Sequence, residues 1–210
     1  MNASDLPAIQ YTVWPTDLHG HRFQVKLHIA NPDPQGQILQ MPAWMPGSYL
    51  IRDFSKHIES IEAFTAGSSR KKITLERIDN DQWLLSDTNS AVDIVTTVYA
   101  FDNSVRAAYL DTERAFFNAT SLCLMVKGQT HVPCSLTITP PESVHAESWI
   151  VQTRLTSAKT DARGFGFYLA KNYDDLIDHP VAMGEFQIVR WNSNSTPHSM
   201  AIQDGYIRLM

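Results

Sequence analysis

Apolar and polar residues alternate along most of this chain, and this two-residue period constrains the fold more than any other feature. Ile9, Tyr11 and Val13 alternate with polar neighbours, and the same pattern runs through residues 23–29. Successive side chains of a strand point to opposite faces of a sheet, so the pattern indicates strands with one buried face. A turn sequence, Asp-Leu-His-Gly, lies between the two segments. Residues 8–30 are therefore predicted to form an antiparallel hairpin.

The same rhythm continues to the end of the sequence, and no window of about 12 residues shows the apolar stripe of a long helix. Further strands are predicted at 57–65, 72–78, 82–86, 91–101, 121–127, 132–139, 147–152, 164–170, 183–191, 198–203 and 206–209. One short helix is expected at 172–178, where Asn172 suits the N-cap and Pro180 ends the segment. The pattern predicts a mainly β chain built from antiparallel sheets, arranged as a sandwich or a saddle.

Composition narrows the class of protein. Hydrophobic residues make up 43% of the chain and charged residues 19%, which is typical of a globular domain. A net charge of −5 argues against a nucleic-acid partner. No apolar run approaches the roughly 20 residues of a membrane span, so no membrane partner is expected. The N-terminus has no basic and apolar signal sequence, which predicts a cytoplasmic location.

No complete catalytic set is visible. The chain contains no His-Glu-x-x-His, Cys-x-x-Cys or Gly-x-Ser-x-Gly motif. His19 and His21 flank a glycine, but a metal site needs further ligands, so no metal-binding or catalytic residue is assigned. The two cysteines, Cys123 and Cys134, are too few for a disulfide scaffold, and Cys123 is expected to be an inert core thiol. A glycosidase or metalloenzyme complete within this chain is therefore disfavoured.

The segment 41–58 has an unusual composition, with two prolines, a glycine, large aromatics and an Arg-Asp pair. Proline and glycine exclude a regular helix or central strand, and the aromatics are too apolar for an ordinary loop. We expect a stiff, buried crossover. Arg52 and Asp53 are adjacent and should not pair with each other; each is expected to serve structure, by default through an ion pair with another residue.

Segments across the chain resemble the glycyl aminopeptidase family of zinc metallopeptidases, distant relatives of aminopeptidase N. The most specific is Pro-Ala-Trp-Met-Pro-Gly-Ser-Tyr-Leu-Ile-Arg-Asp-Phe at 42–54. Tyr-Ala-Phe at 99–101, Leu-Asp-Thr-Glu-Arg-Ala-Phe-Phe-Asn-Ala-Thr-Ser-Leu at 110–122 and Tyr-Asp-Asp-Leu-Ile-Asp-His-Pro-Val-Ala-Met-Gly at 173–184 follow in the same order. The resemblance covers about residues 8–190.

The resemblance implies an N-terminal β domain at 1–178, followed at 179–210 by the first strands of a thermolysin-like peptidase domain that is truncated before its zinc ligands. Zinc would be bound by the parent protein outside this chain, and no cofactor is expected within it. The chain alone would be inactive. Its partners would be its own catalytic domain and peptide substrates with small N-terminal residues such as Gly or Ala.

In such enzymes a β domain contributes groups that hold the substrate's α-ammonium. The resemblance suggests the 111–118 loop for this role, with Asp111, Glu113 and Asn118 as substrate-binding candidates and Glu113 as the best single choice. A purely structural loop is the alternative. The function implied is a scaffold and substrate-positioning domain of a zinc aminopeptidase.

A different class of function also fits the residues. Trp44, Tyr49 and Trp83 could form a stacking platform of a stand-alone β-sandwich that binds peptide or carbohydrate. That hypothesis requires exposed, coplanar aromatics. The aminopeptidase hypothesis expects these aromatics to be buried and an exposed apolar surface within 181–210.

Overall fold

The computed structural model describes residues 6–45, 47–86 and 88–203. The chain is mainly β, as predicted, with one short α-helix and three described 3-10 helices. The strands are β1 (Ile9–Asp17), β2 (Arg22–Ile29), β3 (Gln37–Gln40), β4 (Ile58–Thr65), β5 (Lys72–Ile73), β6 (Leu75–Asp79), β7 (Gln82–Leu85), β8 (Val92–Tyr99), β9 (Ala108–Leu110), β10 (Arg114–Phe117), β11 (Met125–Val126), β12 (Cys134–Ile138), β13 (Ile150–Gln152), β14 (Thr156–Thr160), β15 (Gly166–Ala170), β16 (Val181–Gly184), β17 (Phe186–Ser193) and β18 (Thr196–Gln203). The helices are η2 (Phe54–His57), η3 (Ala119–Ser121), η4 (Val144–Ala146) and α1 (Tyr173–Ile177).

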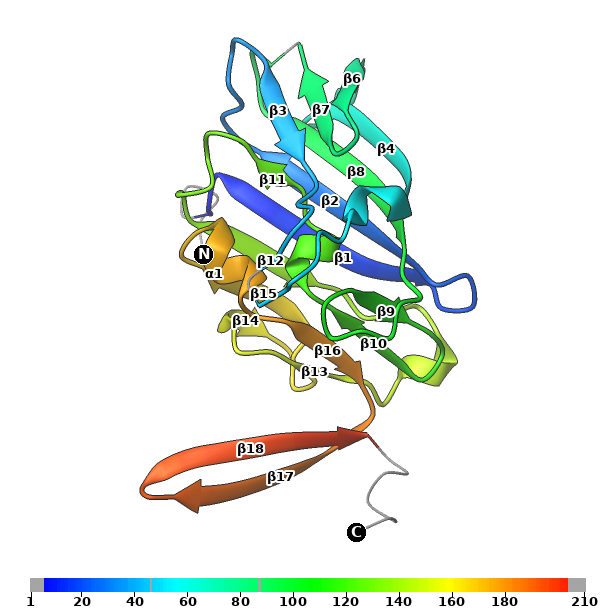
Figure 1. Cartoon of the computed structure of the whole chain (residues 1–210), viewed down its shortest axis with the longest axis vertical. Helices are drawn as coiled ribbons and strands as arrows, with labels where there is room; N and C mark the ends of the chain where they lie inside the picture. Colours follow the sequence, from blue (N-terminus) through cyan, green and yellow to red (C-terminus); the bar gives the residue numbers. More distant parts are fainter. Residues whose placement is uncertain (1–5, 46, 87, 204–210) are drawn as a thin grey trace.

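One large sheet forms the back of the molecule in Figure 1. Its eight strands lie in the order β14-β15-β12-β1-β2-β8-β4-β5. The predicted hairpin of residues 8–30 is present as β1 and β2. The neighbours β1 and β12 run parallel, although the sequence led us to expect antiparallel pairing throughout. Parallel pairing joins strands far apart in the sequence, which alternation alone does not reveal.

Two smaller sheets lie on the front of the large one (Figure 1). One has the order β11-β3-β7-β6 and the other β13-β16-β10-β9. Alternate residues of β1 and β2 are buried, so one face of the large sheet packs inward and the other meets solvent. On the solvent face Asp93 accepts from Lys26 Nζ at 3.0 Å and contacts His28 Nδ1 at 2.7 Å. The arrangement is the layered β architecture that the period predicted.

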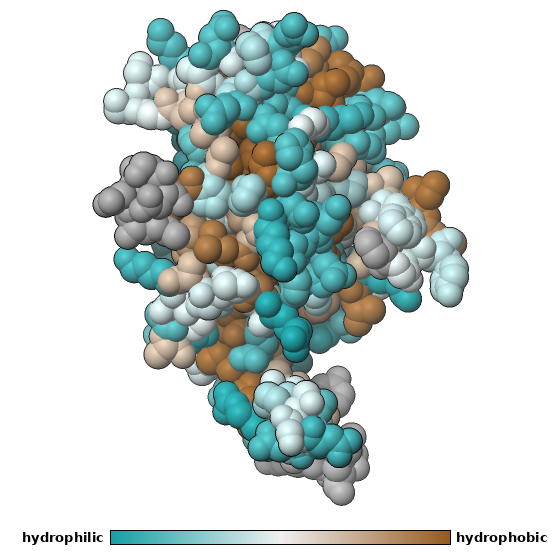
Figure 2. All heavy atoms as spheres, turned by 90° about the vertical axis from the view of Figure 1, so that its left-hand side faces the viewer, coloured by the Kyte–Doolittle hydropathy of each residue, from teal (hydrophilic) through white to brown (hydrophobic). Residues whose placement is uncertain are grey.

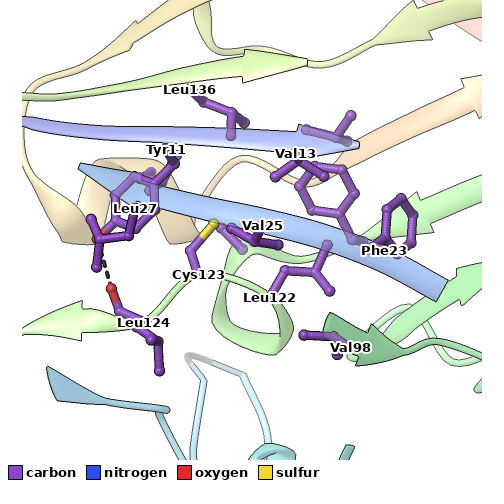
Figure 3. Packing of buried hydrophobic residues seen from close by; sticks show 14 of the residues in the cluster. Tyr11, Val13, Phe23, Val25, Leu27, Val98, Leu122, Cys123, Leu124 and Leu136 are labelled. Atoms are coloured by element: carbon purple, nitrogen blue, oxygen red, sulfur yellow. Dashed lines mark hydrogen bonds between the residues drawn. The ribbon is translucent and has the colours of Figure 1, made fainter. Parts of the chain in front are cut away.

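The core lies between these layers. Side chains from β1, β2 and β12 meet the irregular segment after η3, which carries Leu122, Cys123 and Leu124 (Figure 3). The hydroxyl of Tyr11 donates to the carbonyl oxygen of Leu124 at 2.7 Å, which satisfies the polar end of a fully buried ring. Residues 121–127 were expected to form one strand, and only the short β11 is found there. Their burial comes from tertiary packing around an irregular backbone.

Several short elements differ from the predicted strands. β9, β10 and β14 were missed; β9 and β10 have only three and four residues, too few to show a period. The region 183–191 was expected to form one strand, but it is divided between β16 and β17. The predicted strand at 206–209 lies outside the described residues. In contrast, α1 begins as predicted, with Asn172 Oδ1 accepting from the backbone N–H of Asp175 at 2.8 Å.

The last described strands differ in how they are supported. β16 pairs with both β10 and β13, so residues 181–184 are hydrogen-bonded to the strands before them. β17 and β18 pair only with each other among the described strands, and they project from the body as a hairpin (Figure 1). The division into domains at 178/179 stays a prediction. Because β16 belongs to the same sheet as β10, the pairing favours a boundary a few residues later.

Two further sequence expectations concern the cysteines and membrane spans. Cys123 is free and buried, as expected for a core thiol, and Cys134 is also free and buried. Burial raises the pKa of the Cys134 thiol to about 12 and that of Cys123 further. In the described part of the chain, no helix is long and apolar enough to cross a membrane.

Candidate functional site

The turn between β9 and β10 carries two of the three predicted site residues. Asp111 Oδ1 accepts from the backbone N–H groups of Glu113 and Arg114, each at 2.8 Å. Its Oδ2 accepts from the Tyr109 hydroxyl at 2.7 Å, and this hydrogen bond is the main cause of a raised Tyr109 pKa. These three hydrogen bonds show that Asp111 shapes the turn. Its assignment as a substrate-binding residue stays a prediction.

Asn118, the third predicted residue, is also occupied within the fold. It is 4% exposed and forms the N-cap of η3. Its Oδ1 accepts from the backbone N–H of Thr120 at 3.2 Å and from the Thr120 hydroxyl at 2.8 Å. The predicted 111–118 loop is in fact a three-residue turn followed by strand β10. Consequently Asn118 lies at the far end of that strand, where it caps a helix.

Glu113 is different from the other two residues. Its side chain is exposed, and no hydrogen bond or ion pair to it is found among the described residues. It lines a surface cavity of about 460 Å³, together with Thr112, His145, Trp149, Glu185 and Gln203. This cavity lies where β16 ends and the β17–β18 hairpin begins. Of the three predicted residues, Glu113 alone has a carboxylate available to an external ligand.

A second carboxylate gives the cavity an acidic character. Glu185 follows β16 directly, and the Ser148 hydroxyl donates to its Oε2 at 3.3 Å. Trp149, 1% exposed, supplies an apolar wall. Two carboxylates beside a buried indole favour an ammonium group, which they can accept through charge-assisted hydrogen bonds. Sequence inspection missed Glu185 and Trp149 because they lie in the connections after β16 and before β13, far from Glu113 in the sequence, and share no local motif with it.

Close backbone packing places Glu113 and Glu185 at the adjoining ends of two neighbouring strands, β10 and β16. Arg114 pairs with Gly184 across β10 and β16. A Cβ at Gly184 would lie 3.3 Å from the carbonyl oxygen of Glu113 and 3.3 Å from the Arg114 Cβ. Glycine at this position therefore lets the Glu113 turn lie against the strand that leads to Glu185.

Stacked side chains support the β9–β10 hairpin, which carries the Glu113 turn. The rings of His21 and Phe101 stack with centroids 3.8 Å apart, and those of Phe101 and Tyr109 stack at 5.3 Å. The Arg114 guanidinium lies 4.7 Å from the Tyr109 ring centroid. His21 Nδ1 also contacts the carbonyl oxygen of Leu110 at 2.6 Å. These contacts hold the β9–β10 hairpin firmly, so that the turn bearing Glu113 has a defined position.

The cavity does not have the chemistry of a zinc site. Over residues 6–45, 47–86 and 88–203, no group of three or more His, Cys, Asp or Glu side chains is placed to hold a metal ion. His145, the one histidine in the cavity, makes an edge contact with His19 at 6.5 Å between ring centroids. The arrangement can bind a cation through carboxylates, but it offers no ligand set for zinc.

The segment 41–58 departs from the buried crossover that we expected. Met41, Met45 and Phe54 are buried, but Trp44 is 53% exposed and Tyr49 is fully exposed. Trp83 is 4% exposed and lies below the Arg77 guanidinium. None of the three rings proposed as a stacking platform stacks on another among the described residues. The platform of the binding-module hypothesis is therefore absent, and the expected burial of Trp44 and Tyr49 was wrong.

Arg52 and Asp53 do not pair with each other, as predicted. The default expectation of an ion pair with another residue is not met among the described residues, which supply neither with an oppositely charged partner within 4.0 Å. Asp53 adopts a left-handed backbone with φ of 47° before η2, and its Oδ1 accepts from the Ser55 hydroxyl at 3.0 Å. Its role is to turn the chain into η2.

Comparison with known proteins agrees with the layered fold. A crystal structure of an aminopeptidase N family protein from Idiomarina loihiensis superposes with a TM-score of 0.85 at 41% sequence identity, covering 92% of this chain and 32% of that one. An M1 zinc metallopeptidase mutant from Deinococcus radiodurans gives 0.48 at 4% identity, over 90% of this chain and 44% of that one. Yeast LTA4 hydrolase with bestatin gives 0.49 at 9% identity, over 90% and 30%.

No curated protein sequence matches the chain. This chain spans about a third of the length of the Idiomarina protein. A sequence model described as the peptidase M61 N-terminal domain matches residues 10–185, which end just after β16. That match covers most of the chain, and its limits agree with the hydrogen-bonded body that precedes the hairpin. The chain therefore belongs to the peptidase M61 N-terminal domain family.

Proposed function

We propose that this chain is the N-terminal domain of a zinc-dependent aminopeptidase that removes small residues, Gly or Ala, from the N-termini of peptides. The membership of a peptidase family and the 41% identity to an aminopeptidase N family protein carry the proposal. The Deinococcus neighbour is described as a zinc metallopeptidase. Since the described residues offer no zinc ligand set, the metal would be held by another part of the parent protein.

The part we assign to this chain is substrate positioning. Glu113 presents a free carboxylate, and Glu185 lines the same cavity. A free peptide N-terminus carries an ammonium group with three N–H donors. Two carboxylates can accept from it through charge-assisted hydrogen bonds, which are stronger than hydrogen bonds between neutral groups. In this proposal Glu113 accepts from the substrate's α-ammonium, while Trp149 shields the pair from water on one side. Asp111 and Asn118 hold the surrounding backbone and do not touch substrate.

The proposed function is tested with two versions of the protein. The full-length parent and residues 1–210 alone are assayed on glycyl-p-nitroanilide, with zinc and after removal of zinc by a chelator. We expect zinc-dependent release of p-nitroaniline from the parent and none from the 210-residue chain. Turnover by the short chain would show that the active site has been misplaced. An inactive, zinc-loaded parent would contradict the aminopeptidase assignment.

We also propose a cytoplasmic location, which agrees with two cysteines that are buried and unbridged. Cell fractionation tests this, because a secreted or periplasmic protein would be found outside the cytoplasmic fraction.

A further inference from the structure

The segment 44–52, between β3 and η2, displays large apolar side chains to solvent. Tyr49 is fully exposed, Ile51 is 80% exposed, Leu50 64% and Trp44 53%. Four large apolar residues within one short segment form a patch of the kind that marks interaction sites, whereas isolated exposed apolar residues are ordinary. In Figure 2 a lobe with hydrophobic side chains projects at the right-hand edge, which corresponds to the front of Figure 1, where the β3–η2 connection lies.

Hydrogen bonds fix the described backbone on both sides of Pro46, at 43–45 and 47–52. The N–H of Arg52 donates to the carbonyl oxygen of Ala43 at 2.7 Å, which closes the segment at its base. Ser48, 7% exposed, lies at its centre, and its hydroxyl donates to the carbonyl oxygen of Leu50 at 2.9 Å. The Trp44 indole N–H donates to the carbonyl oxygen of Ser48 at 2.8 Å. The exposed side chains are thus presented by a preformed loop, which lowers the entropic cost of binding a partner.

A guanidinium without a carboxylate partner among the described residues, that of Arg52, lies beside the apolar patch. Arg52 is half-buried, and its Nε lies 3.4 Å from the Ser48 hydroxyl oxygen. No carboxylate of the described residues pairs with it. A half-buried guanidinium is costly to leave without an anion, and it selects carboxylates by bidentate hydrogen bonding. The surface that fits this loop is therefore apolar with one carboxylate.

We propose that Trp44 and residues 47–52 form the docking surface for the polypeptide that follows residue 210 in the parent protein. This inference rests on the proposed function, because it takes the chain to be one domain of a larger peptidase. The occupant is chosen because the Idiomarina protein, at 41% identity, has about two thirds of its length outside the matched region. A remainder of comparable length in the parent protein is covalently linked to the loop, which favours it over a separate partner molecule.

A second feature of this chain supports the same occupant. One face of the β17–β18 hairpin carries Val189, Trp191 and Met200, all more than 40% exposed, and cross-strand pairing places them side by side. An isolated two-stranded hairpin is marginally stable in water, so this face also needs a covering layer. The hairpin is the route by which the chain leaves the body (Figure 1). The polypeptide that continues from this hairpin is therefore the partner best placed to cover both the hairpin face and the apolar loop.

Photo-crosslinking in the full-length parent tests the docking directly. Tyr49 is replaced by a benzoyl-phenylalanine residue, and crosslinked peptides are identified by mass spectrometry after illumination. We expect crosslinks within one chain, to residues beyond 210. Crosslinks between two copies, crosslinks confined to residues 1–210, or no crosslinks would each overturn the proposal. Ile78 on β6, 44% exposed and apolar, is the matched control position, and it should give no crosslinks beyond residue 210.

A stability comparison gives an independent readout. The double substitution Leu50→Ser and Ile51→Ser removes apolar surface that the 210-residue chain leaves in water, so its thermal midpoint should not change. In the full-length parent the same change should lower the midpoint by several degrees. A parent whose midpoint is unchanged by the double substitution would contradict docking.

The hydrolysis assay of the unsubstituted parent keeps the two proposals distinguishable. An inactive parent that still crosslinks would sink the function alone, and an active parent without crosslinks would sink the docking surface alone.

Discussion

Replacing Asp111 by alanine removes the acceptor that organises the β9–β10 turn, and its cost can be worked out from the contacts. Asp111 accepts three hydrogen bonds, two from backbone N–H groups at 2.8 Å and one from the Tyr109 hydroxyl at 2.7 Å. A typical net contribution is about 1 kcal/mol for each bond. Because the turn is partly exposed and water can replace some of this, we expect Asp111→Ala to lower the free energy of unfolding by about 2 kcal/mol.

The assay is thermal or urea denaturation of the 210-residue chain followed by circular dichroism. For a protein of this size, about 2 kcal/mol corresponds to a fall of roughly 4–8 °C in the thermal midpoint. Asp111→Asn should be milder, since its amide oxygen can still accept from the two backbone N–H groups while losing the carboxylate's bond to Tyr109.

Glu113→Ala is the matched control, two residues along the same turn. Its side chain has no partner among the described residues, so the thermal midpoint should stay at the wild-type value. The reasoning is refuted if Asp111→Ala leaves the midpoint unchanged, or if Glu113→Ala lowers it as much. Either result would mean that the two carboxylates do not divide structural and ligand-binding roles as the contacts indicate.

Two further predictions concern stability. Gly166→Ala should lower the free energy of unfolding, measured by urea denaturation, by about 2–3 kcal/mol, because φ is +138° and a Cβ would lie 2.4 Å from the Lys159 carbonyl oxygen. Gly128→Ala, where φ is +81° and no atom lies within 4 Å of the added Cβ, should lower it by about 1 kcal/mol. Equal losses for the two variants would contradict this reasoning. Burial raises the pKa of the Cys134 thiol to about 12, whereas a cysteine of the unfolded chain has a pKa of roughly 8.5. As pH rises, the unfolded state loses this proton first, so the free energy of unfolding should fall between about pH 9 and pH 12. Cys134→Ala should flatten that slope in urea midpoints measured across this pH range, and an unchanged slope would argue against it.

The elements that the sequence predicted well are those with a strong local signal. Alternation from residue 9 to 29 is long enough to define β1 and β2, and Asn172 before an acidic turn indicates the start of α1. β10 has four residues and could not be distinguished from a loop by its period. The parallel contact of β1 with β12 depends on topology, for which alternation carries no information.

The candidate site was predictable only in part, for two physical reasons. Whether Asp111, Glu113 or Asn118 has a free side chain depends on which backbone groups each one meets, and the turn geometry decides that. The apolar composition of 44–52 was taken to mean burial within this chain, yet Tyr49 and Ile51 are exposed. Composition reports that a side chain is suited to burial, but it does not identify the surface that covers it.

The central claim is that Glu113 holds the substrate's α-ammonium in an aminopeptidase, and steady-state kinetics of Glu113→Gln in the full-length parent test it most directly. Losing a charge-assisted hydrogen bond costs about 1.5–3 kcal/mol, so KM for glycyl-p-nitroanilide should rise by roughly 10- to 100-fold. Glu142→Gln, an exposed carboxylate outside the cavity, should leave KM unchanged. A KM for Glu113→Gln equal to that of the wild-type enzyme would contradict the account.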